Sequence, residues 1–187
     1  MRQNTSQTYQ LTIQLMHSKP PIWRRVLVPA TMKLSRLHDV IQIAMGWTDS
    51  HMHQYELGER IIGIPDPDFD FREVEDERKL TVRDVLQREK SRIDYVYDFG
   101  DDWRHRITLD KILPRKPDVP LPLCLKGRGA CPPEDIGGIW GYQEFLRVLQ
   151  DPEHPEYAEF RDWAPDGFDP NAFDLEETNA LLLEYCR

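Results

Sequence analysis

Two short strings of the chain concentrate side chains that could do chemistry. The first is Asp98-Phe-Gly-Asp-Asp-Trp-Arg-His105, and the second is Cys131-Pro-Pro-Glu-Asp-Ile-Gly-Gly-Ile-Trp-Gly-Tyr142. Each combines carboxylates with an aromatic side chain and turn-forming residues, whereas an ordinary surface loop needs only turn chemistry. If the two strings met in space, their acids could divide acid and base roles or hold magnesium.

The candidate binding cluster takes acids, one histidine and one tryptophan from these strings: Asp98, Asp101, Asp102, Trp103, His105, Glu134 and Asp135. The same acids also have a structural interpretation. Asp101 and Asp102 can bond the amides of a turn at Gly100. Glu134 and Asp135 precede a Gly-rich helix start, where the helix dipole favours anions. We favour the structural interpretation, so no residue is assigned as catalytic.

Histidines and cysteines raise the separate question of a metal site. His51 and His53 are two residues apart, so on a strand both would project from one face, as metal-ligand pairs can. His105, Cys124 and Cys131 could complete the set, but their spacing matches no tight zinc pattern such as Cys-x2-Cys. We therefore expect no cofactor, with zinc or magnesium as the alternative. His105 is expected to be a core histidine bonded to a buried acid.

A basic sheet face is the third candidate surface. It would comprise four arginines near Trp23 and in the first string: Arg24, Arg25, Arg104 and Arg106. Such a face could bind phosphate. Asp94 and Asp98 on the preceding strand are expected to pair with the last two arginines, which would neutralise much of this charge.

Familiar catalytic patterns are missing from the sequence. Asp98-Phe-Gly100 matches the magnesium-binding triplet of protein kinases, but the Gly-rich loop and the His-Arg-Asp loop that must precede it are absent. No Gly-x-Ser-x-Gly string occurs, and no cysteine has a local activating motif. Kinase chemistry is therefore excluded, and nucleophilic hydrolysis is unsupported.

Charge is distributed unevenly along the 187 residues, whose formal net charge is −9. Residues 132–187 hold 14 acidic and three basic side chains, so the rest of the chain is close to neutral. A long acidic segment repels phosphate backbones. A protein partner or a small ligand is therefore expected rather than nucleic acid.

The sequence indicates a cytoplasmic protein with no membrane partner. No stretch reaches the roughly 18 apolar residues that cross a bilayer, and the N-terminus has no apolar signal core. The cysteines are too few for a disulfide framework, so they are expected to be free thiols: Cys124, Cys131 and Cys186.

The order of apolar patterns predicts an α+β fold. Residues 9–15 and 22–28 form a hairpin, because apolar and polar residues alternate in the first segment and Pro20-Pro21 marks the turn. One helix, from Ser35 to the stop at Gly46, is expected to pack on the sheet after this hairpin. The sheet is expected to be mostly antiparallel, with about five to six strands, the others lying at 53–57, 60–64, 92–99 and 103–109.

The remaining segments complete a single domain over residues 1–187. The β-rich part is 8–113, within which the polar stretch 65–79 is expected to be a mobile loop. Proline density predicts an extended connector over 114–138. Residues 139–187 form an acidic helical part, expected as a cluster of about three helices.

Several specific strings occur in an order typical of one family. They are Ile22-Trp-Arg-Arg, Leu37-His-Asp-Val-Ile-Gln42, Met45-Gly-Trp47, the two strings above and Phe168-Asp-Pro170. With these strings the chain resembles the plasmid pRiA4b ORF-3-like family, also labelled insertion-element passenger TnpR, over nearly its whole length. The resemblance implies a prokaryotic α+β domain of uncharacterised function, often encoded near mobile elements.

Three functional hypotheses follow. The leading one is a non-catalytic binding or interaction module, because no catalytic constellation is complete. The second is a metal-dependent hydrolase or nuclease that uses Asp98, Asp102, His105 and Glu134. The third is a DNA-associated accessory protein, as the resolvase-like label suggests. A serine recombinase, however, needs a nucleophilic Ser among arginines and a helix-turn-helix, and neither can be placed here.

Overall fold

The protein contains one eight-stranded sheet and five helices in the part of the chain that the computed structural model describes, residues 7–66, 73–165 and 167–186. The strands are β1 (Gln7–Leu15), β2 (Trp23–Pro29), β3 (His53–Leu57), β4 (Arg60–Gly63), β5 (Val74–Asp76), β6 (Arg92–Tyr97), β7 (Trp103–Pro114) and β8 (Leu123–Arg128). The helices are α1 (Leu34–Met45), α2 (Val82–Val85), α3 (Gly138–Leu149), α4 (Tyr157–Trp163) and α5 (Leu175–Tyr185). The strand order is β5-β4-β3-β6-β7-β1-β2-β8.

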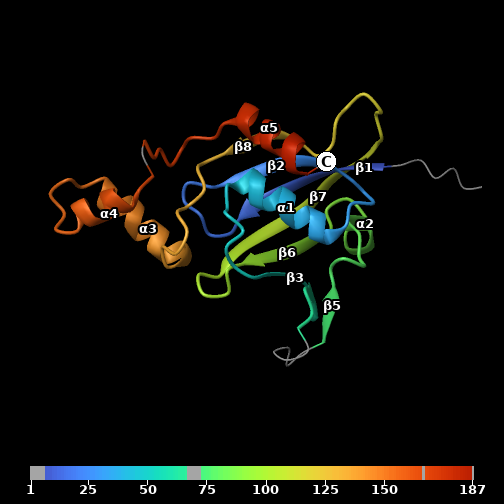
Figure 1. Ribbon diagram of the computed structural model, residues 1–187, viewed down its shortest axis with the longest axis horizontal. Coiled ribbons are helices and arrows are strands. Elements are labelled where there is room, and N and C mark those ends of the chain that lie inside the picture. Colours follow the sequence, from blue (N-terminus) through green and yellow to red (C-terminus); the bar gives the residue numbers. More distant parts are fainter. Residues whose placement is uncertain (1–6, 67–72, 166, 187) are drawn as a thin grey trace, which may run out of the picture.

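Alternation along the strands separates a buried face of the sheet from a polar one. In β1, Tyr9, Leu11 and Ile13 are buried, whereas the residues between them are only partly so. Helix α1 lies across the apolar face, with Leu37 and Ile41 buried against it, and α5 packs beside α1 and against β8 (Figure 1). The core is therefore a sheet layer under one layer of helices. No helix of the described residues is long and apolar enough to cross a membrane.

The α+β class is confirmed, but the sheet is larger than the five to six strands predicted. It is also a mixed sheet, because β5 pairs parallel to β4. The two strands that the sequence missed lie within the expected loop 65–79 and the expected connector 114–138. Both are edge strands, with one neighbour each, so neither needs a strong apolar alternation. Residues 67–72 of the expected loop lie outside the described residues.

The helices correct two further expectations. Helix α1 begins at Leu34 after Lys33, one residue before the predicted cap at Ser35, and ends at Gly46 as expected. The three C-terminal helices exist, but they do not form one cluster. Helices α3 and α4 pack together at one end of the molecule, whereas α5 returns to cover the sheet beside α1 (Figure 1). The chain between α4 and α5 is long enough to allow this separation.

The edge strand β8 is protected by a side chain of α5. The amide of Asn179 accepts a hydrogen bond from the N–H of Cys124 at 2.8 Å and donates one to its carbonyl at 2.9 Å. The side chain thus occupies the hydrogen-bonding groups that another strand would use, which guards the edge against pairing with a second chain.

Arg24 of β2 is a buried cation that donates its hydrogen bonds to main-chain oxygens. Only 2% of the residue is exposed, and burial lowers its pKa to about 10. The guanidinium donates to the carbonyls of Ala44 (2.6 Å), Met45 (3.4 Å), Trp23 (2.9 Å), Arg128 (2.9 Å) and Gly129 (2.8 Å). It also lies 4.2 Å from the ring centroid of Phe173. Arg24 therefore does not belong to a basic sheet face, which corrects that part of the prediction.

We predict that Arg24→Met will lower the free energy of unfolding by about 3–5 kcal/mol, because buried carbonyls lose their donors at once. Arg25→Met is the matched control. Arg25 is a partly exposed arginine on the same strand, paired with Asp110 at 3.4 Å, and its loss should cost less than about 1 kcal/mol. Urea denaturation of both variants measures the difference, and equal losses would contradict the prediction.

Candidate functional site

The two strings meet in space, at the turn before β7 and the loop before α3. The carboxylate of Asp101 accepts a hydrogen bond from the N–H of Gly137 at 3.1 Å. A Cβ atom on Gly138 would lie only 2.2 Å from the main-chain oxygen of Asp101, and Gly138 has a φ of +66°. The contact therefore requires glycine at this position, for both its space and its backbone conformation.

His51, which lies outside both strings in the sequence, is located where the two strings meet. The Nε2 atom of His51 lies 3.8 Å from Oδ2 of Asp98, 3.8 Å from Oε2 of Glu134 and 3.2 Å from Oδ1 of Asp135. The three ligand atoms of His51, Asp98 and Asp135 all lie within 4.8 Å of one another, so together they could hold a metal ion. We call these four residues the His51 cluster.

One carboxylate oxygen of Glu134 accepts hydrogen bonds, and the other faces His51. Its Oε1 accepts hydrogen bonds from the N–H and the hydroxyl of Thr48, both at 2.9 Å, and from the hydroxyl of Tyr97 at 3.1 Å. Burial raises the pKa of Tyr97 to about 12, so its phenol stays protonated and donates. Oε2 is buried and has no hydrogen-bond partner among the described residues, and the same is true of Nε2 of His51.

The two aspartates of the cluster sit in left-handed backbone conformations. Asp98 has a φ of +57°, and its Oδ1 accepts from the N–H of Gly100 at 2.9 Å, which leaves Oδ2 facing His51. Asp135 has a φ of +56°, and its side chain is 71% exposed. Such conformations are uncommon outside glycine and are found at sites where the surroundings hold them. The cluster is closed by Asp98 and Glu134 and open to solvent at Asp135.

Other members of the predicted cluster lie elsewhere. His105 is fully buried and accepts a hydrogen bond at its Nε2 from Nε1 of Trp47 at 3.2 Å, so it is a core histidine, but its partner is not the acid that we expected. Asp102 points to Arg104, at 3.0 Å. Trp103 packs in the core against Trp47, with ring centroids 5.0 Å apart. The first string therefore places Trp103 and His105 in the core and Asp98 and Asp101 at the junction.

His51 and His53 do not share a strand face, because β3 begins only at His53. His53 instead pairs with Glu77 at 2.9 Å and stacks on His38, with ring centroids 3.6 Å apart and an interplanar angle of 10°. The pair Cys124 and Cys131 lies near Arg24, and burial raises the pKa of both thiols. The five residues considered for zinc are therefore distributed among separate parts of the fold.

A closed ring of hydrogen bonds holds His38 in one tautomer. Gln42 donates to the hydroxyl of Tyr95 at 2.9 Å, and this hydroxyl lies 2.8 Å from Nδ1 of His38. Nε2 of His38 lies 2.9 Å from the carboxylate of Asp49, whose N–H donates back to Gln42. A carboxylate only accepts, so Nε2 carries the proton and Nδ1 accepts from the phenol. The ring is complete with a neutral imidazole.

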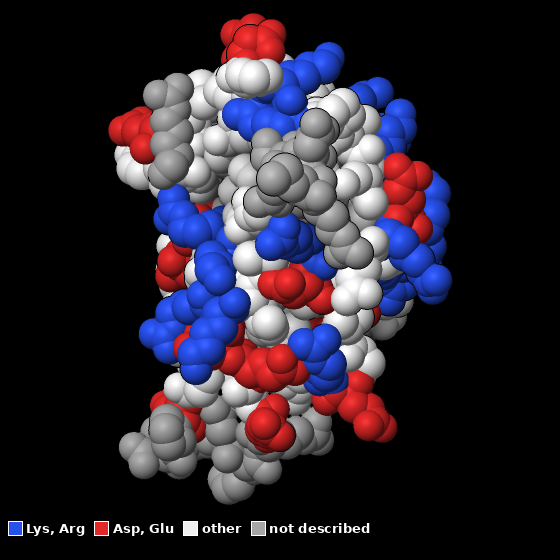
Figure 2. All heavy atoms as spheres, turned by 90° about the vertical axis from the view of Figure 1, so that its right-hand side faces the viewer, with Lys and Arg blue, Asp and Glu red and all other residues white. Residues whose placement is uncertain are grey.

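The remaining three arginines of the predicted basic face are all paired with acids. Arg25 lies 3.4 Å from Asp110 and Arg106 lies 2.9 Å from Asp94, as expected for the latter. Arg104 pairs with Glu56 and Asp102 and not with Asp98, because Val96 is its cross-strand neighbour. On the face that Figure 2 shows, Lys and Arg likewise lie beside Asp and Glu.

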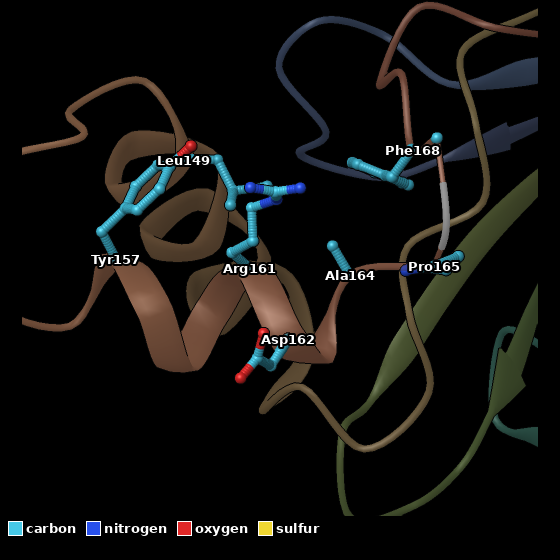
Figure 3. Close-up of a pocket in the computed structure, with 8 residues that line it drawn as sticks. Leu149, Tyr157, Arg161, Asp162, Ala164, Pro165 and Phe168 are labelled. Carbon is cyan, nitrogen blue, oxygen red and sulfur yellow. The ribbon is translucent and has the colours of Figure 1, made fainter.

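Two further places were compared with this junction: a second group of acids with a histidine, and a hollow beside α4. Glu144, His154 and Glu156 could group around an ion, but Arg147 already bonds the first two of them. A hollow of about 560 Å³ lies between α3, α4 and the segment after it. Its charged lining is Arg161, which extends toward Phe168, and Asp162, which points away (Figure 3). Neither place joins the two strings.

Sequence reasoning missed the way in which the junction is completed. The sequence groups His51 with His53, His105 and two cysteines and not with the acids of the two strings, and no pattern in it identifies Thr48 and Tyr97 as supports for Glu134. A usable signal was present, since residues 48–51, Thr-Asp-Ser-His, form a polar run directly after Trp47. No local pattern marked Glu77, which is 2% exposed although it lies in a polar stretch.

Fold and site define an α+β protein in which two loop strings converge on a histidine–carboxylate cluster. The chain belongs to the plasmid pRiA4b ORF-3-like family, because the sequence model of that family matches residues 7–177. It is 38% identical over 173 residues to the uncharacterized protein y4hQ of Sinorhizobium fredii (strain NBRC 101917 / NGR234), covering 92% of this chain and 89% of that one. No catalytic function is shown for the family.

A solved structure shares the fold. It is the crystal structure of a protein of unknown function, MM3350 from Methanosarcina mazei Go1, with a TM-score of 0.84 and 37% sequence identity. The match covers 93% of this chain and 98% of that chain. The architecture described above is therefore similar to that of the Methanosarcina mazei protein.

We predict that Gly138→Ala will separate the two strings and lower the free energy of unfolding by about 2 kcal/mol or more, because the added methyl group meets the carbonyl of Asp101. Gly58→Ala is the matched control, since Gly58 has a similar φ of +62° with nothing within 4 Å of the added atom. Chemical denaturation measures both. A loss no larger than that of the control would show that the contact at Asp101 contributes nothing.

We also predict a loss of stability in acid that depends on His105. Burial lowers its pKa to about 4, while the unfolded chain takes up the proton near 6.5. The free energy of unfolding should therefore fall as the pH drops from about 6.5 toward 4, by up to about 3 kcal/mol. His105→Gln should reduce this slope, whereas Trp47→Phe, which removes the same hydrogen bond but keeps the imidazole, should retain it. Identical slopes in all three proteins would refute the assignment.

Proposed function

We propose that this protein is a divalent-cation-binding module, with His51, Asp98, Glu134 and Asp135 as the ligands. The observation that carries the proposal is the pair of buried, unpartnered atoms, Nε2 of His51 and Oε2 of Glu134, that face one another at 3.8 Å. Imidazole with carboxylates suits zinc, manganese or iron(II) better than magnesium or calcium.

The spacing of the cluster supports a cation at its centre. The separations of 3.8 Å from Nε2 of His51 to Asp98 and Glu134 are too long for hydrogen bonds, and the 3.2 Å separation to Asp135 is at the upper limit for one. Two ligands that bind the same ion at about 2.0–2.2 Å lie roughly 3–3.6 Å apart. The distances from His51 are therefore close to those between ligands of one ion, and the ligand atoms of His51, Asp98 and Asp135 lie within 4.8 Å of one another, with Glu134 Oε2 at 3.8 Å from His51.

Charge supports the same conclusion. Across residues 7–66, 73–165 and 167–186, none of the three carboxylates has a Lys or Arg within salt-bridge distance. Carboxylates this close to one another repel unless a cation or a proton lies between them. A bound divalent ion would remove that repulsion and would tie the turn before β7 to the loop before α3.

Binding rather than catalysis is the role we assign to the site. All four side chains are used as ligands, so no histidine or acid is left over as a general base. The exposed side at Asp135 leaves room for water or a ligand on the ion, so metal-dependent hydrolysis is the second candidate. A cytoplasmic location is part of the proposal, because the cysteines are free. The ion-paired arginines offer little support for binding DNA.

The proposal predicts that the purified protein binds about one equivalent of manganese or zinc and melts at a higher temperature when it does. His51→Ala and Glu134→Gln should each weaken the affinity by about tenfold or more, because each removes a ligand. Isothermal titration calorimetry with the metal salts and a thermal melt measure the two effects.

Glu144→Gln is the matched control, since Glu144 is an exposed acid of the group around Arg147 and should leave the affinity unchanged. Absence of binding to manganese, zinc and magnesium would sink the proposal. So would binding that the two cluster variants leave intact, because the ion would then lie elsewhere.

A further inference from the structure

One carboxylate oxygen of Glu134 is fully engaged in hydrogen bonds. Its Oε1 accepts three of them, from the N–H and the hydroxyl of Thr48, both at 2.9 Å, and from the hydroxyl of Tyr97 at 3.1 Å. A carboxylate oxygen has about two lone-pair sites, so three donors leave none of them free for an ion. Oε2, which faces Nε2 of His51 at 3.8 Å, is the oxygen that remains able to coordinate.

Ser50 fixes the direction of both hydroxyl donors. A carboxylate only accepts, so the hydroxyl of Thr48 gives its one proton to Glu134, and the hydroxyl of Ser50 donates to Thr48 at 2.7 Å. The N–H of Ser50 donates to the phenol oxygen of Tyr97 at 3.0 Å, which leaves the phenol proton for Glu134. Hydrogen bonds joined in a chain strengthen one another. Because Ser50 directly precedes His51, one short segment both supplies the imidazole and holds Glu134.

Asp98 is also oriented so that one of its oxygens faces His51. Its Oδ1 accepts from the N–H of Gly100 at 2.9 Å, and its Oδ2 lies 3.8 Å from Nε2 of His51. The side chains of Asp98 and Glu134 are 10% and 20% exposed, against 71% for Asp135. The two enclosed carboxylates of the cluster therefore each present one oxygen to its centre.

This arrangement suits an ion that needs few protein ligands. The cluster offers one imidazole nitrogen and one oxygen from each of three carboxylates. Zinc is bound by about four such nitrogen and oxygen donors. Calcium takes about six to eight oxygens and often draws two of them from one carboxylate. Glu134 cannot supply a second oxygen while Thr48 and Tyr97 are bonded to it.

We propose that Thr48 and Tyr97 make the His51 cluster selective for zinc over calcium, because their hydrogen bonds restrict Glu134 to coordination through one oxygen. Both are positioning residues, since neither is a ligand. The inference rests on the proposed cation site and goes beyond it by assigning the choice of ion to side chains outside the ligand set. Hydrogen-bond donors behind a ligand orient that ligand and tune the affinity of the site.

The test measures zinc and calcium affinities by isothermal titration calorimetry with each metal chloride, for the full-length protein and for the double variant Thr48→Val/Tyr97→Phe. The unaltered protein should bind zinc more tightly than calcium. In the double variant the ratio of the zinc affinity to the calcium affinity should fall by about tenfold or more, because zinc loses an oriented ligand. The affinity for calcium should itself rise, because Oε1 becomes free to coordinate.

Thr12→Val/Tyr55→Phe is the matched control. The hydroxyl of Thr12 donates to the carboxylate of Asp110 at 2.6 Å, and that of Tyr55 donates to the carbonyl of Leu34 at 2.8 Å. The same chemical groups are thus removed from partners outside the cluster, and the ratio should not change. Thr48→Ser retains the hydroxyl and should also retain the ratio. Thermal melts without metal show whether each variant is folded.

Thr48→Val alone provides a second measurement, because Thr48 is exposed and its replacement disturbs little packing. Oε1 of Glu134 then keeps the N–H of residue 48 and the bond from Tyr97, which at 3.1 Å is long for a hydroxyl donor. The ratio should move in the same direction by a smaller factor. If the double variant does not fold, an unchanged ratio in Thr48→Val overturns the inference.

The outcomes separate this inference from the function on which it rests. If zinc binds but the double variant leaves the ratio unchanged, or weakens both metals alike, the selectivity inference is overturned and the cation module stands. Calcium binding as tight as zinc binding in the unaltered protein, or binding of manganese without zinc, overturns it in the same way. If zinc, manganese and magnesium all fail to bind, the inference and the proposed function fall together.

Discussion

The arrangement around the site depends on the buried guanidinium of Arg24. Its hydrogen bonds reach the last carbonyls of α1, at Ala44 and Met45, and the carbonyls at the end of β8 and directly after it, at Arg128 and Gly129. The C-terminal end of a helix carries partial negative charge, so a cation there is stabilised although it has no carboxylate partner. One arginine thereby fixes the starting points of two segments: the one that leads to His51 and the one that leads to Glu134.

From these two starting points the chain converges on the turn before β7. The carboxylate of Asp101 bonds the loop before α3, Glu134 reaches back to Thr48, and Tyr97 supports Glu134 from β6. Acidic side chains from two loops are thus brought close together, and no arginine or lysine of the described residues pairs with them. The hydrogen bonds to one oxygen of Glu134 leave its other oxygen without a partner among the described residues, and Asp98 turns its second oxygen toward His51. At the junction the carboxylates are held in place but have no Lys or Arg partner among the described residues. On the polar face of the sheet, by contrast, Arg and acidic side chains form ion pairs.

Patterns that depend on neighbours in the chain were predictable. The alternation of Tyr9, Leu11 and Ile13 marked a strand of the sheet, and Gly46 marked a helix end, because burial of one face and a left-handed cap act through adjacent residues. The edge strands β5 and β8 were missed, because an edge position relaxes the demand for apolar alternation. His105 was placed correctly in the core but given the wrong partner, since Trp47 lies far from it in sequence.

By itself the sequence determined the α+β class, the hairpin order, the family and the identity of three of the four cluster residues. Only the tertiary structure decided that His51 completes that cluster and that His105 and Asp102 leave it. The physical reason is that helix α1 and strand β2 must be packed before Arg24 can position the segments after them. A side chain's neighbours along the chain set its local conformation, whereas its charge partners are set by which distant segments the core brings together.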